Sequence, residues 1–429
     1  MRIAIVVQRY GAEVLGGSEL LSRLVAERLA VQHDVDVLTT CARDYVTWKN
    51  EYQEGSDRIR GVTVRRFSSS QTRDIDAFNR FSEWIFSHAH SRDDELNWLR
   101  QQGPWCPSLI EYLKQNHQQY DVLVFFTYLY SLTVLGLDVS PGKSVLVSTA
   151  HDEPAIKLGI FKEVFARPAA ICYLTESEAR FVKREFSDRP LLEEVIGVGV
   201  DLPQQHPYQR MPPVTDADTV AAGVQDESSD ENESAELRYP SHLLDRGAVF
   251  RRRHRLHGSV LLYGGRIDPG KGCEELIEYF DRYVKEGGEG TLALMGVKLM
   301  SLPEEPFIRF AGLLSDGERL QALEAATVVS CPGPYESLSL IALEALAAGT
   351  PILANARSPV LVEHCQKSNG GLYYADSDEF TECLSLLFGD ARLRLALGRN
   401  GREYVRQNYR WDVVLGKYDR LFSKVRLGK

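Results

Sequence analysis

The sequence SVLLYGGRIDPGKG, which occupies Ser259–Gly272, decides the fold of the second half of this 429-residue chain. Its first part, Ser259–Tyr263, is a short and mostly apolar run, which is typical of a buried strand. Gly264 and Gly265 follow directly, and Lys271–Lys285 has apolar residues at helical spacing. A strand, a glycine-rich turn and a helix in this order predict one βα unit of a parallel sheet.

The same order occurs near the start of the chain. Ile3–Val7 predicts a buried strand, Gly16 and Gly17 form the turn, and Ser18–Ala30 predicts an amphipathic helix. Further strands are predicted at Val35–Leu38, Val122–Phe126, Ser144–Val147, Ala170–Tyr173, Thr291–Leu294, Thr327–Cys331 and Pro351–Ala354. Helical stretches separate most of these strands. The fold class is therefore α/β, with two similar doubly wound halves.

The alternation stops at residues 203–242. Within this segment, residues 211–237 hold eight acidic side chains and no basic one, and little that would pack in a core. We predict a flexible acidic insert between a first domain at residues 1–202 and a second at 243–411. The net charge of −10 comes mostly from this insert, so the rest of the chain is nearly balanced. Chain-wide basic character that would hold nucleic acid is missing, and Arg251–Arg255 is best explained as a solvated helix end or linker.

Several features predict a cytoplasmic protein. The seven cysteines are widely spaced and odd in number, which is typical of a reducing compartment and gives no zinc signature. The apolar run at Ile3–Val7 is shorter than a secretory signal needs. The most apolar stretch, Val122–Leu137, carries several polar residues and is shorter than the ~20 residues of a membrane span.

Both glycine-rich turns are candidate anion sites. Gly16 and Gly17 allow close approach of a ligand to free N–H groups at a helix start, although an ordinary turn with Ser18 as N-cap explains them equally well. The turn at Gly264 and Gly265 adds two cations, Arg266 and Lys271, which suit phosphate oxygens. A cation at a helix start opposes the helix dipole, which favours an anionic ligand here.

Two carboxylates and a histidine complete the candidate site. Glu336 and Glu344 are eight residues apart, which is ~12 Å along a helix and too far for a hydrolytic acid/base pair. We interpret them as contacts to two parts of one elongated ligand, while Glu344 as a satisfied structural acid remains an equal alternative. His151 follows the strand Ser144–Val147, at the sheet edge where open α/β sheets bind ligands, and a packed loop histidine is the alternative.

Taken in order, these strings resemble the retaining glycosyltransferases of family 4, which have the GT-B fold of two Rossmann-like domains facing each other across a cleft. In the second half the matching strings are Leu261–Arg266, Lys271-Gly272, Ile308–Gly312 and Pro334–Pro351. In the first half they are Gly16-Gly17, His151-Asp152, Thr175–Arg184 and Val198–Asp201. The segment Tyr409–Trp411 matches the family's terminal region, which implies that a helix at about 412–429 crosses back to the first domain.

The resemblance also implies roles for these residues. Arg266 and Lys271 would hold the diphosphate, with backbone contacts from Gly265 and, across the cleft, from Gly16 and Gly17. Glu336 would bind hydroxyls of the donor sugar, Glu344 the ribose of the nucleotide, and His151 would sit near the reacting face of the sugar. No metal and no cofactor are expected, since Asp34-Val35-Asp36 and Asp74-Ile75-Asp76 match a DxD metal motif by letter only.

The chain departs from the family pattern in the donor pocket. The usual Glu-Gly-Phe-Gly is replaced by Glu336, Ser337, Leu338 and Ser339, and the glycines usual before the next helix by Asn355–Pro359. These bulkier residues leave the identity of the donor open. Residues 72–118 have no clear counterpart in the family. We predict that they form a wall of the acceptor site to which at least one of Trp84, Trp98 and Trp105 is exposed, against the alternative that these aromatics pack their own domain.

The sequence thus predicts a hexosyltransferase that moves a sugar from a nucleoside diphosphate sugar, UDP-linked by preference, to a glycan, lipid-linked or small hydroxyl acceptor. Peripheral contact with the inner face of a membrane is compatible with this prediction. The alternatives are a GDP-mannose-dependent mannosyltransferase, a nucleotide-sugar epimerase, and a non-catalytic GT-B protein that binds sugar nucleotides or glycans. The joint presence of Arg266, Lys271, Glu336, Glu344 and His151 argues against a decayed site.

Overall fold

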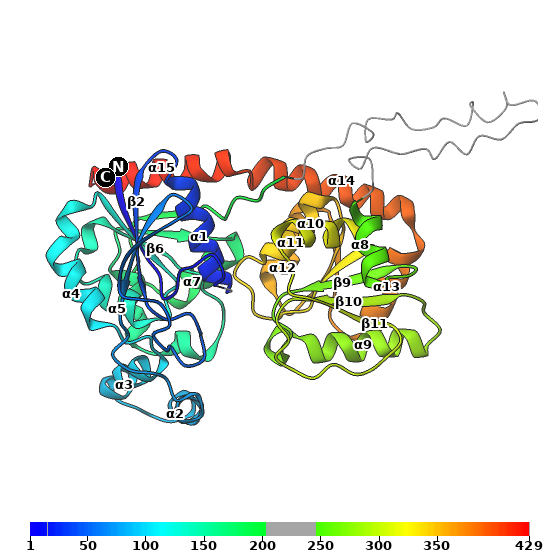
Figure 1. Cartoon of the computed structure of the whole chain (residues 1–429), viewed down its shortest axis with the longest axis horizontal. Helices are drawn as coiled ribbons and strands as arrows, with labels where there is room; N and C mark the ends of the chain where they lie inside the picture. The colour runs from blue at the N-terminus through cyan, green and yellow to red at the C-terminus, as the bar shows by residue number, and fades with distance from the viewer. Residues whose placement is uncertain (15, 203–245, 429) are drawn as a thin grey trace, which may run out of the picture.

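The computed structural model describes residues 1–14, 16–202 and 246–428 and contains two α/β lobes (Figure 1). The predicted insert at 203–242 lies outside these described residues. In the first lobe eight strands form one sheet in the order β3-β4-β2-β1-β5-β6-β7-β8. Their bounds are β1 Arg2–Val6, β2 Asp34–Thr40, β3 Gly55–Ile59, β4 Val62–Phe67, β5 Val122–Phe126, β6 Ser144–Val147, β7 Ala170–Tyr173 and β8 Leu192–Val195. Among them only β3 and β4 pair antiparallel.

The helices of the first lobe cover both faces of this sheet. They are α1 Gly17–Leu29, α2 Ile75–Ser87, α3 Arg92–Gln102, α4 Pro107–Asn116, α5 Ser131–Gly136, α6 Ile160–Ala166 and α7 Glu176–Glu185. Successive residues of β1 serve opposite faces, as a strand requires. Ile3 and Ile5 pack in the core that contains α1, whereas Ala4 and Val6 pack in the core that contains α4. Helices α2 and α3 protrude from one end of the lobe (Figure 1).

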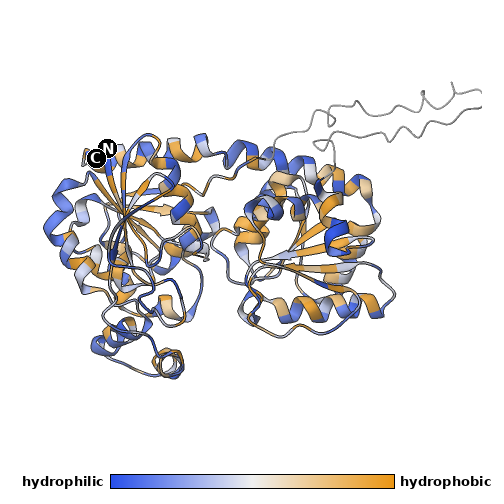
Figure 2. Cartoon of the chain, in the orientation of Figure 1, coloured by the Kyte–Doolittle hydropathy of each residue, from blue (hydrophilic) through white to orange (hydrophobic). Residues whose placement is uncertain are grey.

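The second lobe has a six-stranded sheet in the order β11-β10-β9-β12-β13-β14, with parallel pairing throughout. Its strands are β9 Val260–Gly264, β10 Thr291–Met295, β11 Ile308–Gly312, β12 Val328–Cys331, β13 Ile352–Asn355 and β14 Gly371–Tyr374. Its helices are α8 Arg246–His254, α9 Cys273–Lys285, α10 Asp316–Ala325, α11 Leu340–Ala348, α12 Pro359–Ser368, α13 Ser377–Gly389 and α14 Ala391–Asn408. The apolar strands lie inside each lobe, beneath helices with polar outer faces (Figure 2).

The α/β class with two parallel-sheet lobes is therefore confirmed. Helix α15, Trp411–Arg426, runs from α14 back to the first lobe, as predicted (Figure 1). It packs against α1 and β5, and it buries Val414, Tyr418 and Phe422 completely. His33 Nε2 lies 2.8 Å from Asp419 Oδ1 at the same contact. The last described helix is thus part of the core of the first domain.

Candidate active site

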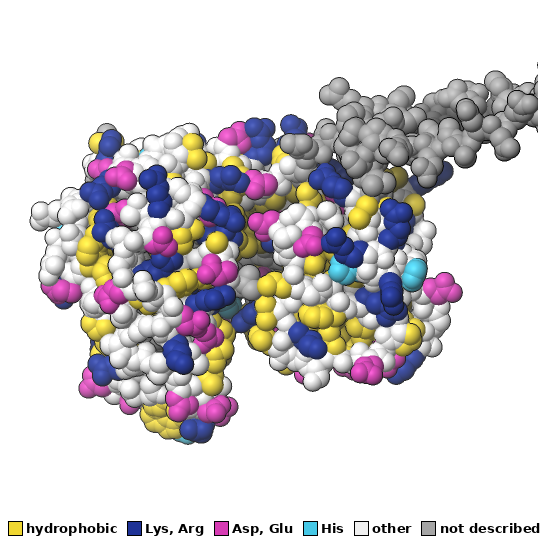
Figure 3. Space-filling view, viewed as in Figure 1, with side chains coloured by type: hydrophobic (Ala, Val, Ile, Leu, Met, Phe, Trp, Pro, Cys, Tyr) yellow, Lys and Arg dark blue, Asp and Glu magenta, His cyan; other side chains and the backbone are white. Residues whose placement is uncertain are grey.

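A cleft of about 800 Å³ separates the two lobes. Its floor and walls come from loops that follow β1, β5 and β6 on one side and β9 and β12 on the other, together with α2. The space-filling view shows this hollow with charged side chains on its rim (Figure 3). These loops all leave the carboxyl ends of parallel strands, where open α/β sheets bind ligands.

The turn after β9 places both predicted cations on the cleft. Asp268 caps the short helix Pro269–Lys271, because its Oδ1 accepts the N–H of Lys271 at 3.0 Å. Gly272 then has φ 74°, and a Cβ there would lie 2.6 Å from the carbonyl oxygen of Pro332. Glycine is required on both counts. The turn leaves the side chain of Arg266 43% exposed, with Nε 3.4 Å from Asp268 Oδ2.

The structure brings two predicted residues into direct contact. Lys271 Nζ donates a hydrogen bond to Glu336 Oε1 at 2.8 Å, and both side chains line the cleft. Both are only partly buried. An anion that binds Lys271 competes with Glu336 for the same ammonium group. Release of Glu336 would then leave its carboxylate free to accept hydrogen bonds from hydroxyl groups.

The loop that carries Glu336 compensates for its missing glycines. Ser337, Leu338 and Ser339 all line the cleft, and Ser339 has φ 64°, in the left-handed region. A residue with a Cβ pays for this conformation, and such strain concentrates at functional loops. The left-handed backbone typical of glycine is therefore present here without glycine.

Two other predicted donor residues do not line the cleft. Glu344 lies on α11, where its Oε1 accepts a hydrogen bond from Arg319 Nη2 at 2.9 Å. Burial raises the pKa of Glu344 despite this guanidinium. Gly265 uses its N–H in a bond to the carbonyl of Met295 at 3.0 Å. Of the diphosphate and sugar contacts predicted in the second lobe, the cleft thus gathers Arg266, Lys271, Glu336 and the loop residues that follow it.

The opposite wall begins at the turn after β1. Gly16 and Gly17 line the cleft, and a Cβ on Gly16 would lie 2.1 Å from Glu19 Oε2, whereas nothing lies within 4 Å of a Cβ on Gly17. Glu19 accepts bonds from Arg9 Nε at 2.9 Å and Nη2 at 2.6 Å. The side chains of this pair are only 7% and 6% exposed. The positive charge of Arg9 is therefore neutralised within the wall.

His151 stands on the same wall and faces Tyr335 of the other lobe, with the ring centres 6.2 Å apart. Its Nε2 lies 3.5 Å from Glu153 Oε1, and the hydroxyl of Tyr128 donates to the same carboxylate. Burial alone would lower the pKa of His151, but the Glu153 carboxylate outweighs burial and the pKa lies above its ordinary value. The Nδ1 of His151 is buried and has no hydrogen-bond partner among the described residues.

Glu178 supports this wall from behind. The N–H groups of Ala150 and Leu174 donate to its carboxylate at 2.6 and 2.5 Å, and the hydroxyl of Ser148 donates to it as well. Burial raises the pKa of Glu178 to about 7. This single side chain holds the loop that presents His151 and the start of α7.

Helix α2 forms the wall beside His151. It turns one helical stripe toward the cleft, namely Ile75, Phe78, Asn79, Ser82, Glu83 and Phe86. Of the three predicted tryptophans only Trp98 lines the cleft; it is 2% exposed and donates from Nε1 to Ser82 at 2.9 Å. Trp84 lies outside the cleft lining, stacked with Phe81 and His88, and Trp105 packs under Arg100.

Several cleft residues were not predicted from the sequence. Tyr45 has the guanidinium carbons of Arg9, Arg73 and Arg266 at 5.7, 5.1 and 5.6 Å from its ring centre, the last of them from the other lobe. Glu19 and Glu153 were missed as well. The only signal for Arg9 was its position three residues after β1, at the edge of the sheet where open α/β sheets bind ligands.

Two features are absent from the described residues. Within them, no helix combines the length and the hydropathy that a membrane crossing requires. In the same part of the chain, histidine, cysteine and acidic side chains do not gather in groups of three that would hold a metal ion.

Comparison with known proteins gives the following relatives. Residues 258–390 match the family model described as glycosyl transferases group 1. A D-inositol 3-phosphate glycosyltransferase of Corynebacterium efficiens is 26% identical over 186 residues, which cover 39% of this chain and 43% of that protein. A GDP-mannose-dependent monoacylated alpha-(1-6)-phosphatidylinositol monomannoside mannosyltransferase of Corynebacterium glutamicum is 22% identical over 169 residues, which cover 36% of this chain and 44% of that protein. The chain thus spans less than half the length of these curated relatives.

Solved structures match over the whole chain. The crystal structure of Anabaena HepE in complex with UDP and glucose has a TM-score of 0.67 at 15% identity, and the match covers 99% of this chain and 100% of that one. At this identity the likeness establishes the fold alone, and that fold is the predicted GT-B architecture. Residues 258–390 are therefore similar to the glycosyl transferases group 1 family, within a chain that has the GT-B fold.

Proposed function

We propose that this protein is a retaining, metal-independent glycosyltransferase that moves a hexose from a nucleoside diphosphate sugar to a hydroxyl acceptor. One observation carries the proposal: Arg266 and Lys271 both face the cleft from the turn after β9, directly beside Glu336. Preorganised cations of this kind stabilise the charge that develops on a departing diphosphate. They supply that charge from the protein itself, so the step needs no metal.

The remaining cleft residues fit the other parts of the reaction. When the diphosphate takes over Lys271, Glu336 accepts hydrogen bonds from the donor sugar. His151 lines the opposite wall of the same cleft and contacts the sugar near its reacting carbon. The closed arrangement of both walls holds donor and acceptor in one orientation, which lowers the entropic part of the barrier.

The stripe of α2 is the proposed acceptor wall. Phe78 and Phe86 offer aromatic faces to the apolar face of a sugar, and Asn79, Ser82 and Glu83 offer polar groups beside them. Trp98 supports the stripe from behind through Ser82. An acceptor bound here would approach the donor sugar from the side of His151. The proposed acceptor is a glycan, a lipid-linked sugar or a small hydroxyl compound.

UDP is the favoured carrier, since the HepE structure was solved with UDP and glucose. The GDP-mannose-dependent relative keeps GDP-mannose as the second candidate donor. A thermal-shift panel of UDP, GDP, ADP and TDP sugars separates them. A ligand at 100 times its Kd adds about 2.7 kcal/mol, which raises the melting temperature by a few degrees. Release of the nucleoside diphosphate in the presence of candidate acceptors then tests transfer, and a protein that binds none of the four has another function.

The acceptor wall needs its own variants. Phe86→Ala should raise the KM of the acceptor at least ~5-fold and leave the Kd of the donor unchanged, because Phe86 lines the cleft on α2 and is 38% exposed. Trp84→Ala is the matched control, since Trp84 is equally exposed on the same helix but lies outside the cleft lining. Equal effects of the two substitutions on the acceptor would contradict this placement.

A further inference from the structure

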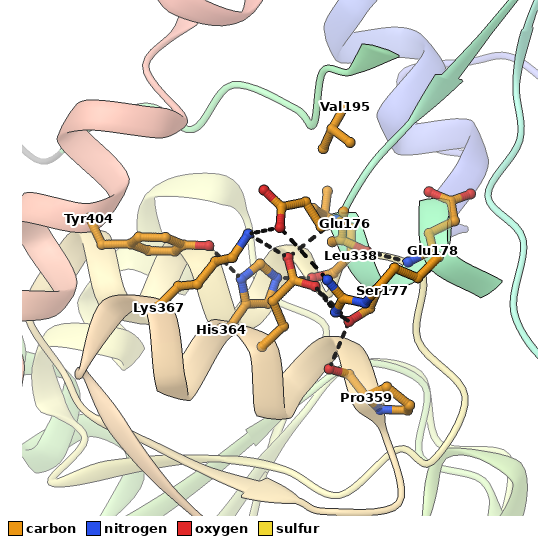
Figure 4. A network of polar contacts seen from close by, with 12 residues as sticks. Glu176, Ser177, Glu178, Val195, Leu338, Pro359, His364, Lys367 and Tyr404 are labelled. Atoms are coloured by element: carbon orange, nitrogen blue, oxygen red, sulfur yellow. Dashed lines mark hydrogen bonds and ion pairs between the residues drawn. The ribbon is translucent and has the colours of Figure 1, made fainter. Parts of the chain in front are cut away.

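Helix α12 joins the donor side of the cleft to the first domain. Two adjacent residues of α12, Glu363 and His364, reach in different directions: Glu363 contacts the start of α7 in the first lobe, and His364 contacts the loop between β12 and α11. We call residues 332–339 the β12–α11 loop; it carries Glu336 and the three residues that follow it in the cleft. Figure 4 shows these contacts around His364.

The hydrogen bonds of His364 define its protonation. Its side chain is completely buried, with Nε2 2.7 Å from the carbonyl oxygen of Leu338 and Nδ1 3.2 Å from the hydroxyl of Tyr404 (Figure 4). A carbonyl oxygen only accepts, so Nε2 carries the proton. Burial lowers the pKa of His364, so the ring is neutral and Nδ1 accepts from Tyr404. The tautomer is therefore fixed, and it holds the backbone of Leu338 at one point.

Glu363 makes the contact to the first domain. Its Oε2 accepts from the hydroxyl of Ser177 at 2.5 Å, and its Oε1 accepts from the N–H of Glu176 at 3.2 Å. Arg180 adds an ion pair to Glu363 at 3.1 Å, and Lys367 on α12 pairs with Glu176 at 2.7 Å. The Glu363 side chain is 6% exposed, so its hydrogen bonds to Ser177 and Glu176 are shielded from water, whereas Arg180 and the Lys367–Glu176 pair are solvent-exposed.

A third contact closes the arrangement. Thr175, the N-cap of α7, places its hydroxyl 3.4 Å from the carbonyl oxygen of Ser337. The β12–α11 loop, α12 and α7 thus touch one another pairwise, and each contact is a hydrogen bond to a backbone group or a buried carboxylate. Such a closed set leaves the loop little freedom to move relative to the first lobe.

We propose that His364 and Glu363 are positioning residues for the transfer reaction, His364 by fixing the β12–α11 loop and Glu363 by fixing that loop's domain against the wall that carries His151. The inference rests on the proposed function, because it assigns Glu336 and its neighbours to the donor. It separates two effects. Loss of the His364 bond loosens the donor loop itself, whereas loss of the Glu363 contact disturbs the alignment of the two walls.

The first test uses His364→Leu and His364→Gln in the full chain. Leucine removes the N–H group that binds the carbonyl oxygen of Leu338. The amide nitrogen of glutamine reaches about as far as Nε2 and restores this hydrogen bond. We expect the Kd of the donor sugar nucleotide to rise at least 10-fold in His364→Leu and to return to within 3-fold of wild type in His364→Gln. Thr350→Val is the matched control, since it removes a buried hydrogen bond of 2.7 Å to the carbonyl of Leu323 in the same domain, away from the cleft. It should leave the donor Kd unchanged.

The second test uses Glu363→Gln. Because the donor contacts remain on one domain, the donor Kd should stay within 2-fold, while kcat should fall at least 5-fold. An unchanged kcat, or a donor Kd that rises as much as in His364→Leu, would overturn the assignment of Glu363.

Hydrogen exchange gives a readout that needs no ligand. Peptides that cover residues 335–343 should exchange faster in His364→Leu than in wild type or Thr350→Val. If no nucleotide binds the wild type but this exchange difference is present, the proposed function fails, whereas the fixing of the β12–α11 loop by His364 stands. If His364→Leu exchanges like wild type or keeps its donor Kd, the positioning role is wrong. Tyr404→Phe, which removes only a hydroxyl, gives the same comparison if His364→Leu does not fold.

Discussion

The two walls of the cleft are built from the same local element, a strand followed by a glycine-containing turn and a helix, yet they treat their charges differently. On the first wall Arg9 is closed off by Glu19, and the side chains of both are less than one-tenth exposed. On the second wall Arg266 is 43% exposed, and Lys271 pairs with a partly exposed Glu336. The turns after β1 and β9 therefore have different roles. The first wall uses its ion pair to fix its own shape, and the second keeps its cations accessible to a ligand.

The largest expected effect tests the first half of this comparison. Glu19→Gln removes one partner of a buried pair and leaves the Arg9 charge uncompensated, so the free energy of unfolding should fall by ~3–5 kcal/mol. Glu274→Gln is the matched control, because Glu274 occupies the first turn of α9 as Glu19 does in α1 but is exposed. It should stay within ~0.5 kcal/mol of wild type. Urea unfolding measures the free energy of unfolding of both variants. Equal losses would show that the buried Arg9–Glu19 pair stabilises the fold no more than an exposed glutamate does.

The pH dependence of stability tests how the first wall is supported. Burial raises the pKa of Glu178 to about 7, from an ordinary value of 4.5. Between these two values the folded chain holds a proton that the unfolded chain has released, so the free energy of unfolding falls as pH rises from 4.5 to 7. The contribution amounts to at most ~3 kcal/mol.

Glu178→Gln lacks this titration and serves as the reference. The difference in unfolding free energy between wild type and Glu178→Gln should therefore shift against wild type as pH increases across this window. A difference that stays constant with pH would mean that Glu178 does not titrate there.

The third prediction concerns the accessible cations. Arg266→Ala and Lys271→Ala should each lower the rate of transfer at least ~10²-fold, which corresponds to ~2.7 kcal/mol of transition-state stabilisation. Lys285→Ala, at the exposed far end of α9, is the control and should transfer at the wild-type rate. Initial rates at saturating donor measure all three. Wild-type rates in either cleft variant would remove the basis of the proposed function.

The smallest effect distinguishes the two glycines of the first turn. Gly16→Ala places a methyl group 2.1 Å from the Glu19 carboxylate and should cost ~1–3 kcal/mol of stability. Gly17→Ala meets no atom within 4 Å and should leave the melting temperature unchanged, while the added methyl lowers donor affinity if the diphosphate approaches the backbone there. A donor affinity unaffected in Gly17→Ala would remove this turn from the donor site.

The site residues that could be predicted from the sequence are those that lie close together along the chain. Arg266 and Lys271 fall in one strand–turn–helix unit, so their common position on the cleft follows from local rules. The Lys271–Glu336 pair joins residues 65 positions apart, and it exists only because β9 and β12 are neighbours in the sheet. Strand order is set by tertiary packing, which a local pattern does not encode.

The same limit explains the aromatic segment. Phe78, Phe81 and Ile85 lie at helical spacing, but the face of α2 that meets the cleft depends on how α2 packs against α3. In the structure, Phe86 and Trp98 therefore line the cleft, whereas Trp84 does not. Ser339 gives the converse case. Ser339 stands where the family has a glycine. Its backbone still has a left-handed φ of 64°, because the surrounding contacts impose this conformation.

The path of α15 has a consequence for the order in which the protein is made. Val414, Tyr418 and Phe422 fill the face of the first sheet beside β5 and α1, so residues 1–202 alone leave an apolar surface uncovered. A ribosome delivers these residues only after it has synthesised the entire second lobe. The first domain therefore starts to fold before the second but finishes after it, and the nascent chain must keep that surface from aggregating, or have a chaperone cover it, until the last helix arrives.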